Sequence, residues 1–180
     1  MMSDFVQLRH QPPRELQRPR ELIVACPPMR SSVNLSRIVR AASCCGVRRI
    51  ICCGNARIDP TIARCGQEND RLLEETAAEA TAAEITLHRT LPAVLKRLRE
   101  EGYPLVGLEQ TSSSQCLFDF CFPRKMVLVI GNERLGIEPE VLRLLQHTVE
   151  IAVYGLPYSH NVATATAMAL YEYCRQYPQG

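Results

Sequence analysis

Short apolar runs alternate along the chain with longer segments in which apolar residues recur every three or four positions. Each short run fits a buried strand, because it is brief and has no helical period. Each longer segment fits a helix that packs one face against a core. We predict strands at 21–26, 49–53, 85–88, 104–108, 126–130 and 149–153, and helices at 34–45, 72–83, 91–101, 138–146 and 161–177.

This alternation predicts the fold class. Strands that alternate with helices form a mostly parallel sheet with helices on both faces, which is an α/β architecture. Asn34 fits the N-cap of the first helix and Gly46 its stop. A chain of 180 residues is the size of one domain. We expect a single domain at 21–180, preceded by a basic and flexible arm at 1–20.

Arginine dominates the basic residues, although the formal net charge is only +2. Lys96 and Lys125 are the only lysines, and arginines outnumber carboxylates within residues 1–40. Guanidinium groups bind phosphate oxygens in paired hydrogen bonds. The arm therefore fits either a nucleic-acid contact or a solvated tail.

The cysteines and the apolar runs exclude several classes of protein. The nine cysteines form no CxxC pair, so they indicate no zinc site. We interpret the pairs Cys44–Cys45 and Cys52–Cys53 as small buried hydrophobes in a reducing compartment. No apolar run approaches the length of a membrane span, and the N-terminal residues lack an apolar signal core. We expect a cytoplasmic protein with no metal and no membrane contact.

Polar turns follow three of the predicted strands, at 109–114, 131–136 and 155–161. Ligands of open α/β sheets bind at the carboxyl ends of the strands, so these turns are candidate ligand loops. The sequence has no GxGxxG, GxxxxGK or GxSxG pattern. It therefore does not indicate a dinucleotide enzyme, a P-loop enzyme or an α/β-hydrolase.

Three motifs resemble those of the SpoU (TrmH-like) family of SPOUT RNA methyltransferases. Residues 34–42 read NLSRIVRAA and resemble the family pattern N-x-G-x-x-x-R-x-A. Residues 131–136 read GNERLG and resemble G-N-E-x-x-G, and residues 159–162 read SHNV and resemble S-L-N-V. The motifs occur in the family's order, and the resemblance covers residues 21–177.

The resemblance implies an enzyme that transfers a methyl group from S-adenosyl-L-methionine to a ribose 2′-hydroxyl in RNA. It also implies a C-terminal trefoil knot and a homodimer whose active site is built from two subunits. A tRNA is the favoured substrate, with a D-loop guanosine as one target. Ribosomal RNA, base methylation and an inactive RNA-binding dimer of the same fold are the alternatives.

The resemblance also assigns site residues. For catalysis it implies Arg40, Asn34, Glu133, Ser159 and Asn161. Arg40 acts either as a base or by positioning a phosphate and stabilising oxyanion charge; a guanidinium stays protonated, which favours the second role. For donor binding the resemblance implies Leu108, Gly131, Asn132, Gly136, Ile151, Gly155, Leu156, Ser159 and Asn161.

Several of these residues have a second interpretation. Asn34 and Glu133 fit a polar support for Arg40 or for the adjoining loop, whereas Asn34, Ser159 and Asn161 also fit helix caps. Ser36 stands where the family often has glycine. His160 stands where leucine is common, and is either an inert substitution or a titratable group beside the methyl donor.

Overall fold

Seven parallel strands form one sheet in the computed structural model, which describes residues 12–54 and 83–180. The sheet order is β3-β2-β1-β6-β4-β7-β5, and every neighbouring pair is parallel. This confirms the predicted fold class. The predicted helix at 72–83 and the arm before residue 12 lie outside the described residues. The strands are β1 (Leu22–Cys26), β2 (Arg49–Cys53), β3 (Glu84–His88), β4 (Leu105–Leu108), β5 (Gln115–Cys116), β6 (Met126–Ile130) and β7 (His147–Glu150).

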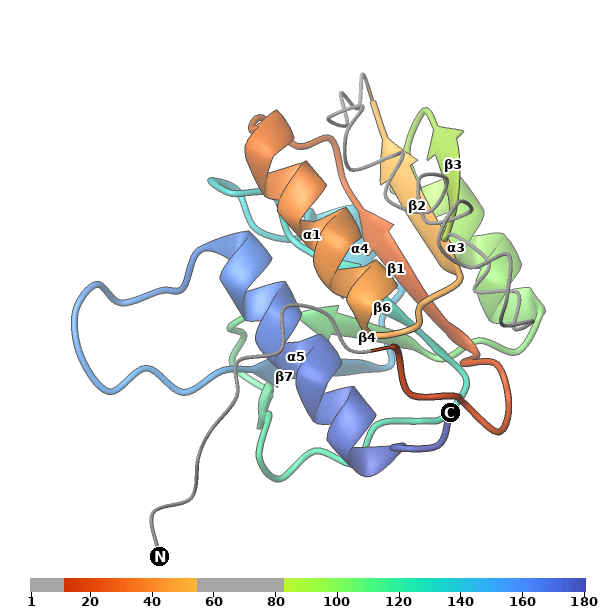
Figure 1. Ribbon diagram of the computed structural model, residues 1–180. Coiled ribbons are helices and arrows are strands. Elements are labelled where there is room, and N and C mark those ends of the chain that lie inside the picture. The colour runs from red at the N-terminus through yellow and green to blue at the C-terminus, as the bar shows by residue number, and fades with distance from the viewer. Residues whose placement is uncertain (1–11, 55–82) are drawn as a thin grey trace, which may run out of the picture.

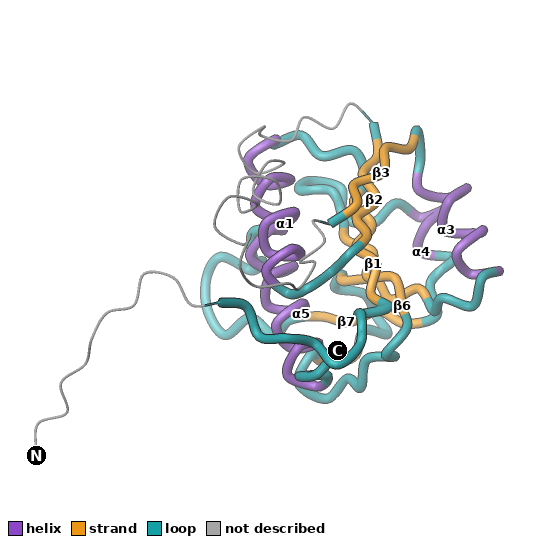
Figure 2. Tube along the Cα trace, turned by 45° about the vertical axis from the view of Figure 1, so that its right-hand side comes forward, coloured by secondary structure: helices purple, strands orange, loops and turns teal. Residues whose placement is uncertain are grey.

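The helices lie in two layers, one on each face of the sheet. On one face, α1 (Ser32–Cys44) packs beside α5 (Val162–Gln176), and the other face carries α3 (Leu91–Glu100) and α4 (Pro139–Leu142) (Figures 1 and 2). Side chains of β1 alternate between the two cores. Leu22 and Val24 pack under α1 and α5, whereas Ile23 and Ala25 pack under α3 and α4. A strand buried on both faces requires the continuous apolar run that predicted it.

Several predicted elements differ from the structure by one or two residues at an end, and two differ by more. The helix expected at 138–146 is wrong in length, because only Pro139–Leu142 is helical. Within four residues of the helix end the chain pairs with β4: the Gln146 backbone N–H donates to the Leu105 carbonyl at 3.0 Å, and its side-chain oxygen accepts from the Leu105 N–H at 2.6 Å. The strand expected at 149–153 is His147–Glu150, since the pairing of β7 with β4 and β5 stops at Glu150.

The segment before β1 contacts the C-terminal end of the chain. The Gln17 N–H donates to the Gln179 carbonyl at 2.9 Å, and the Arg20 guanidinium donates to the Tyr177 carbonyl at 2.7 Å. Arg20 is buried, with 7% of its surface exposed. It therefore takes no part in the phosphate contact expected of the arm's arginines.

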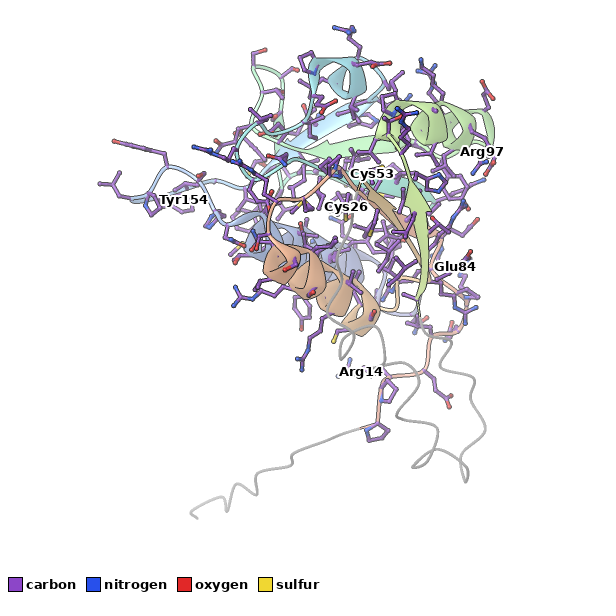
Figure 3. All side chains as sticks on the ribbon, turned by 90° about the horizontal axis from the view of Figure 1, so that it is seen from above. Arg14, Cys26, Cys53, Glu84, Arg97 and Tyr154 are labelled. Carbon is purple, nitrogen blue, oxygen red and sulfur yellow. The ribbon has the colours of Figure 1, made fainter. Side chains whose placement is uncertain are left out.

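Of the two cysteine pairs predicted to be buried, only one is buried in the structure. Cys52 and Cys53 are buried in β2, as expected of small hydrophobes; Figure 3 shows Cys53 and Cys26 in the interior. Cys44 is exposed and Cys45 is half-buried, so the expectation is wrong for that pair. Cys44 is the last residue of α1 and Cys45 is its C-cap.

Within residues 12–54 and 83–180, no helix is both long and apolar enough to cross a membrane. The same residues contain no group of three or more cysteine, histidine or carboxylate side chains arranged to hold a metal ion.

Candidate active site

The parallel order of the sheet brings the predicted ligand loops to one edge. The carboxyl ends of β1, β6, β4 and β7 are neighbours there. The loops that leave them begin at Pro27, Gly131, Glu109 and Ile151. Segments separated by more than 100 residues in the chain therefore meet at this edge, as expected for a ligand site of an open α/β sheet.

The turn after β6 is closed and braced on both sides. Asn132 and Gly136 exchange backbone hydrogen bonds of 2.9 and 3.0 Å. The Asn132 side chain donates to the Pro28 carbonyl at 2.8 Å, and its oxygen accepts from the Arg134 N–H at 3.0 Å. Glu109 accepts from the Ile137 N–H at 2.9 Å, which fixes the far end of the turn.

Glycine is required at both ends of this turn because of close approach. A Cβ at Gly131 would lie 2.8 Å from the backbone carbonyl carbon of Gly136. A Cβ at Gly136 would lie 2.4 Å from the carboxylate of Glu109, and the Gly136 φ of +65° favours glycine independently. Glu109 opens the predicted ligand loop 109–114 but was not among the predicted site residues; the signal for it is an acidic residue directly after a buried strand.

A polar chain joins the three motif segments. The Glu133 carboxylate accepts from the Asn34 side-chain amide at 3.3 Å, and the Asn34 side-chain oxygen accepts from the Asn161 amide at 3.2 Å. Asn161 also accepts from the Ala163 N–H at 2.9 Å and so caps α5. We call Glu133, Asn34 and Asn161 the polar relay. These contacts fit the predicted polar support of the loop at 131–136. A catalytic role for the three residues stays a prediction.

The predicted capping roles are corrected in two places. Ser31, not Asn34, caps α1: its hydroxyl accepts from the Asn34 N–H at 3.2 Å. The Glu133 carboxylate accepts hydrogen bonds from the N–H groups of Arg30 at 3.1 Å and Ser31 at 3.0 Å. A residue distant in sequence therefore fixes the chain before α1. The Asn34 side chain is thereby left to bridge the other two motifs. At α5 the cap is Asn161 alone, because Ser159 lies two residues before it in an exposed loop.

The remaining predicted donor contacts lie in two places. Leu108 ends β4 beside Ile130 and Val149, and Ile151 is the first residue after β7. Gly155, Leu156 and Ser159 belong to an exposed loop, residues 154–160, that extends from the domain between β7 and α5 (Figure 1). His160 lies at its end and is also exposed. Figure 3 shows Tyr154 of this loop directed away from the rest of the molecule.

Arg40 does not join the polar relay within one subunit. It lies on α1 six residues after Asn34, which corresponds to about 9 Å along a helix and about 240° around it. The side chain is exposed, and it has no hydrogen bond or ion pair with any other residue that the structure describes. A single subunit thus brings together Asn34, Glu133 and Asn161 but leaves Arg40 on another face of the helix.

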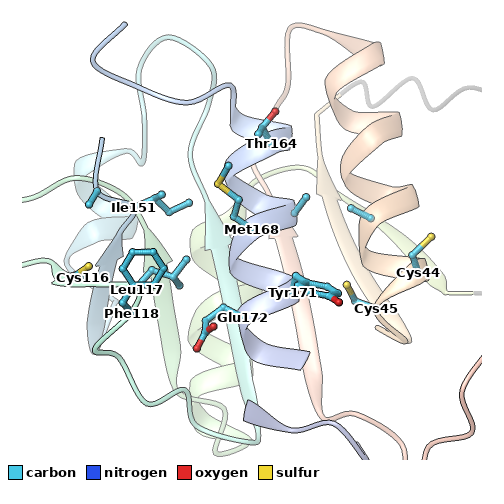
Figure 4. A pocket seen from close by; sticks show the side chains of 13 residues that line it. Cys44, Cys45, Cys116, Leu117, Phe118, Ile151, Thr164, Met168, Tyr171 and Glu172 are labelled. Carbon is cyan, nitrogen blue, oxygen red and sulfur yellow. The ribbon is translucent and has the colours of Figure 1, made fainter. Parts of the chain in front are cut away.

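An apolar pocket of about 660 Å³ lies across the outer surface of α5, between α1 and the turn after β5 (Figure 4). We call its surface the apolar face. Phe118 and Tyr171 are 69% and 76% exposed there, and Met168 is 40% exposed. The sequence of α5 could have predicted this face. Ala169, Leu170 and Tyr173 are buried, whereas Met168 and Tyr171 form a second apolar side that remains exposed. The lining residues are Ala41, Cys44, Cys45, Cys116, Leu117, Phe118, Ile151, Ala152, Thr164, Ala167, Met168, Tyr171 and Glu172.

Solved structures with this fold define its class. The TrmH/SpoU tRNA modifying enzyme of A. aeolicus matches with a TM-score of 0.75 at 24% identity, over 91% of this chain and 79% of that one. The SpoU methyltransferase AviRb of Streptomyces viridochromogenes, in complex with AdoMet, matches with a TM-score of 0.69 at 24% identity, over 92% and 64%. The fold is that of the SPOUT methyltransferases. The model of the SpoU rRNA Methylase family matches residues 21–171, and the chain belongs to this family.

Curated relatives support the same family. A tRNA (guanosine(18)-2′-O)-methyltransferase of Mus musculus is 40% identical over 82 residues, which are 46% of this chain and 5% of that protein. A 23S rRNA (guanosine-2′-O-)-methyltransferase of Acinetobacter baylyi is 28% identical over 160 residues, which are 86% and 60%. The match thus spans less than two thirds of each of these proteins. The predicted resemblance to the family is confirmed.

Hydrogen bonds, mostly from backbone N–H groups, lower the pKa of Glu133. Burial opposes the charge, but hydrogen bonds from the backbone N–H groups of Glu133 itself, Ser31 and Arg30, and from the Asn34 amide, outweigh it. A carboxyl whose pKa is lowered by folding stabilises the folded state above its unfolded pKa of about 4.3. That stabilisation is lost as the pH falls through the folded pKa.

We expect Glu133→Gln to be less stable than the wild type by about 1 kcal/mol at pH 7, a small value because the carboxylate is partly solvated. The difference should shrink as the pH falls below about 4, since the wild-type carboxyl then also becomes neutral. Urea unfolding of both proteins at pH 7 and at a pH below 3, where both folded and unfolded carboxyls are neutral, measures it. A difference that is the same at both pH values would show that the charge of Glu133 does not stabilise the fold.

Proposed function

We propose that this protein transfers a methyl group from S-adenosyl-L-methionine to a ribose 2′-hydroxyl in RNA. The polar relay carries the proposal, because it joins the three motif segments at the ligand edge of the sheet. A tRNA guanosine is the favoured acceptor, supported by the similarity to tRNA (guanosine(18)-2′-O)-methyltransferases of Mus musculus and Aquifex aeolicus. The similarity to the 23S rRNA enzyme makes ribosomal RNA the second candidate.

The loops around the braced turn fit a nucleoside ligand. Glu109 and the two glycines fix the turn at 131–136, while the stretch after Glu150 makes no strand pairing and so keeps backbone groups available for a ligand. Leu108 and Ile151 supply apolar surface beside them. We assign donor binding to these residues together with Asn132, Gly155, Leu156, Ser159 and Asn161. The bound donor supplies an electrophilic methyl group on a sulfonium.

The protein's own part in the reaction is alignment and charge stabilisation. The ribose 2′-oxygen forms a bond to the methyl carbon as the carbon–sulfur bond breaks, the electron pair stays on sulfur, and the hydroxyl proton leaves to water or to an RNA phosphate. Arg40 keeps its proton under these conditions. It positions a neighbouring phosphate and stabilises the charge that develops on the 2′-oxygen.

This role for Arg40 requires a second subunit. Arg40 is exposed on α1 next to Ala41, which lines the apolar face, and is directed away from the polar relay. A second copy of the chain seated on the apolar face would cover Phe118, Met168 and Tyr171 and bring its own Arg40 toward this subunit's donor loops. We therefore propose a homodimer with each active site built from two chains.

The proposal retains two further expectations. The first is a trefoil knot, supported by the insertion of β6 between β1 and β4 and by Asn34, which bonds both Glu133 of the turn at 131–136 and Asn161 at the start of α5. The second is a cytoplasmic location, where the RNA substrates are.

Methyl incorporation tests the function. Purified protein and labelled S-adenosyl-L-methionine are incubated with tRNA and with rRNA from cells that lack the gene, and the nucleosides are analysed by mass spectrometry. We expect 2′-O-methylguanosine in tRNA. Label only in rRNA would favour the second candidate, and a base-methylated nucleoside would contradict ribose methylation. RNA binding without donor binding or incorporation would identify an inactive RNA-binding dimer.

A further inference from the structure

A buried guanidinium lies behind α5, far from the polar relay. Arg20 is 7% exposed, its Nη1 donates to the Tyr177 carbonyl at 2.7 Å, and its guanidinium carbon lies 5.5 Å from the centre of the Tyr173 ring. Its Nε has no hydrogen-bond partner within residues 12–54 and 83–180. No carboxylate among the described residues pairs with it. A buried cation without an anion is unfavourable, so this site stabilises negative charge formed nearby.

Two thiols provide the group that can carry that charge. Cys45 follows α1, Cys174 lies in the last turns of α5, and the Cys174 sulfur is 3.7 Å from the Cys45 carbonyl oxygen. The Cys174 thiol donates to this oxygen, the Cys45 thiol interacts electrostatically with the Cys174 sulfur, and both side chains are only partly buried. This interaction with Cys45 lowers the pKa of Cys174 to about 7 against the effect of burial, and the charge of Arg20 lowers it further. The pKa of Cys45 is raised, because its proton is held between the two sulfurs.

We propose that Cys174 and Cys45 form a peroxide-sensitive thiol pair, activated by Arg20, that closes to a disulfide joining the C-terminal ends of α1 and α5. Both helices begin at the polar relay, with Asn34 in the first turn of α1 and Asn161 as the cap of α5. The disulfide would join them at their opposite ends. This modification site is independent of methyl transfer.

The reaction balances with hydrogen peroxide as the oxidant. The Cys174 thiolate attacks one peroxide oxygen, the O–O bond breaks, and the second oxygen leaves as hydroxide, which takes up a proton to give water. The Cys45 sulfur then attacks the Cys174 sulfenic acid, forming the S–S bond and releasing a second water. Two electrons pass from the two thiols to the peroxide.

The described cysteines in β1 and β2 lack this access to solvent. Cys26 and Cys52 are opposite each other in the register of β1 and β2 but are fully buried, and burial raises the pKa of Cys53 to about 11. Cys174 does not line the apolar face, so a second copy seated there leaves it accessible. Cys45 lines the apolar face, but it reacts only with the Cys174 sulfenic acid and so does not need access to solvent.

Mass spectrometry after limited treatment with hydrogen peroxide tests the pair. Non-reduced tryptic peptides of the full chain should contain a Cys45–Cys174 link that a reductant removes, and the link should persist in the matched control Cys44→Ser. In Cys45→Ser the Cys174 sulfenic acid should remain and be trapped by dimedone. Absence of the link, or oxidation of Cys121 before Cys174, would overturn the proposal.

The pH dependence of alkylation tests the role of Arg20 as a positioning residue. The charged and titratable groups that face Cys174 are Arg20 from the segment before β1, Cys45 after α1, and Tyr173 on its own helix. The rate of iodoacetamide labelling of wild-type Cys174 should have its midpoint near pH 7, and Arg20→Gln should move it upward. The exposed Cys121 serves as the reference thiol in the same sample. A wild-type midpoint equal to that of Cys121 would refute the activation without any variant.

Discussion

Gly131→Ala is expected to weaken binding of S-adenosyl-L-methionine by at least about tenfold, the equivalent of about 1.4 kcal/mol. The added Cβ would lie 2.8 Å from the Gly136 carbonyl carbon, 2.9 Å from the Gly136 Cα and 3.0 Å from the Glu109 carboxylate. Two of these atoms are backbone, so the turn must open rather than a side chain rotate. Overpacking of this kind costs about 1–3 kcal/mol. Titration calorimetry with the donor measures the effect.

Gly155→Ala is the matched control. Gly155 also lies at the carboxyl edge and is also an assigned donor contact, but no atom lies within 4 Å of the position of its added Cβ. Its φ is not positive, so alanine fits without strain. We expect donor affinity within about twofold of the wild type. Equal losses in the two variants would show that any added methyl at this edge disturbs the donor, and would remove the argument from the braced turn.

The arrangement of strands and loops could be predicted from sequence because it depends on local patterns. The runs at 22–26 and 126–130 are apolar throughout, and a central parallel strand needs that composition on both faces. The motif at 131–136 follows such a strand directly, so its place at the carboxyl edge followed from the strand. The contact between Glu133 and Asn34 followed from the family's motifs.

The features that depend on distant partners could not be predicted. The start of α1 at Ser32 depends on Glu133, which holds the preceding N–H groups from 102 residues away. The early end of α4 is followed within four residues by pairing between Gln146 and Leu105. The burial of Arg20 depends on the C-terminal helix, whereas its neighbours in sequence suggested a solvated arm. In each case a tertiary contact overrides the local signal.

Arg40→Ala is expected to reduce methyl transfer by at least about a hundredfold, the range found when a charge-stabilising donor is removed from an active site. Donor affinity should be unchanged, because Arg40 is assigned to the RNA phosphate and the 2′-oxygen and not to the donor. Single-turnover methylation and donor calorimetry separate the two effects. Residual activity above about a tenth of the wild type would contradict a role for Arg40 in the reaction.

Mixed dimers show which subunit supplies Arg40. Two chains with different tags are co-expressed, one carrying Arg40→Ala and the other Gly131→Ala, and the mixed dimer is isolated on both tags. If each site combines Arg40 of one chain with the donor loops of the other, one of the two sites contains neither change. With the donor well below its dissociation constant, the mixed dimer should then have about half of the wild-type activity, although each variant alone has about a tenth of it or less.

The reciprocal dimer gives the opposite expectation and completes the test. Here one chain carries both Arg40→Ala and Gly131→Ala, and its partner is wild type. A shared site places one change in each active site, so this dimer should be nearly inactive. If instead each chain uses its own Arg40, the wild-type chain keeps an intact site and the two results are exchanged. Failure to isolate any dimer on both tags would contradict the homodimer itself, because the apolar face formed by Phe118, Met168 and Tyr171 would then have no second copy to cover it.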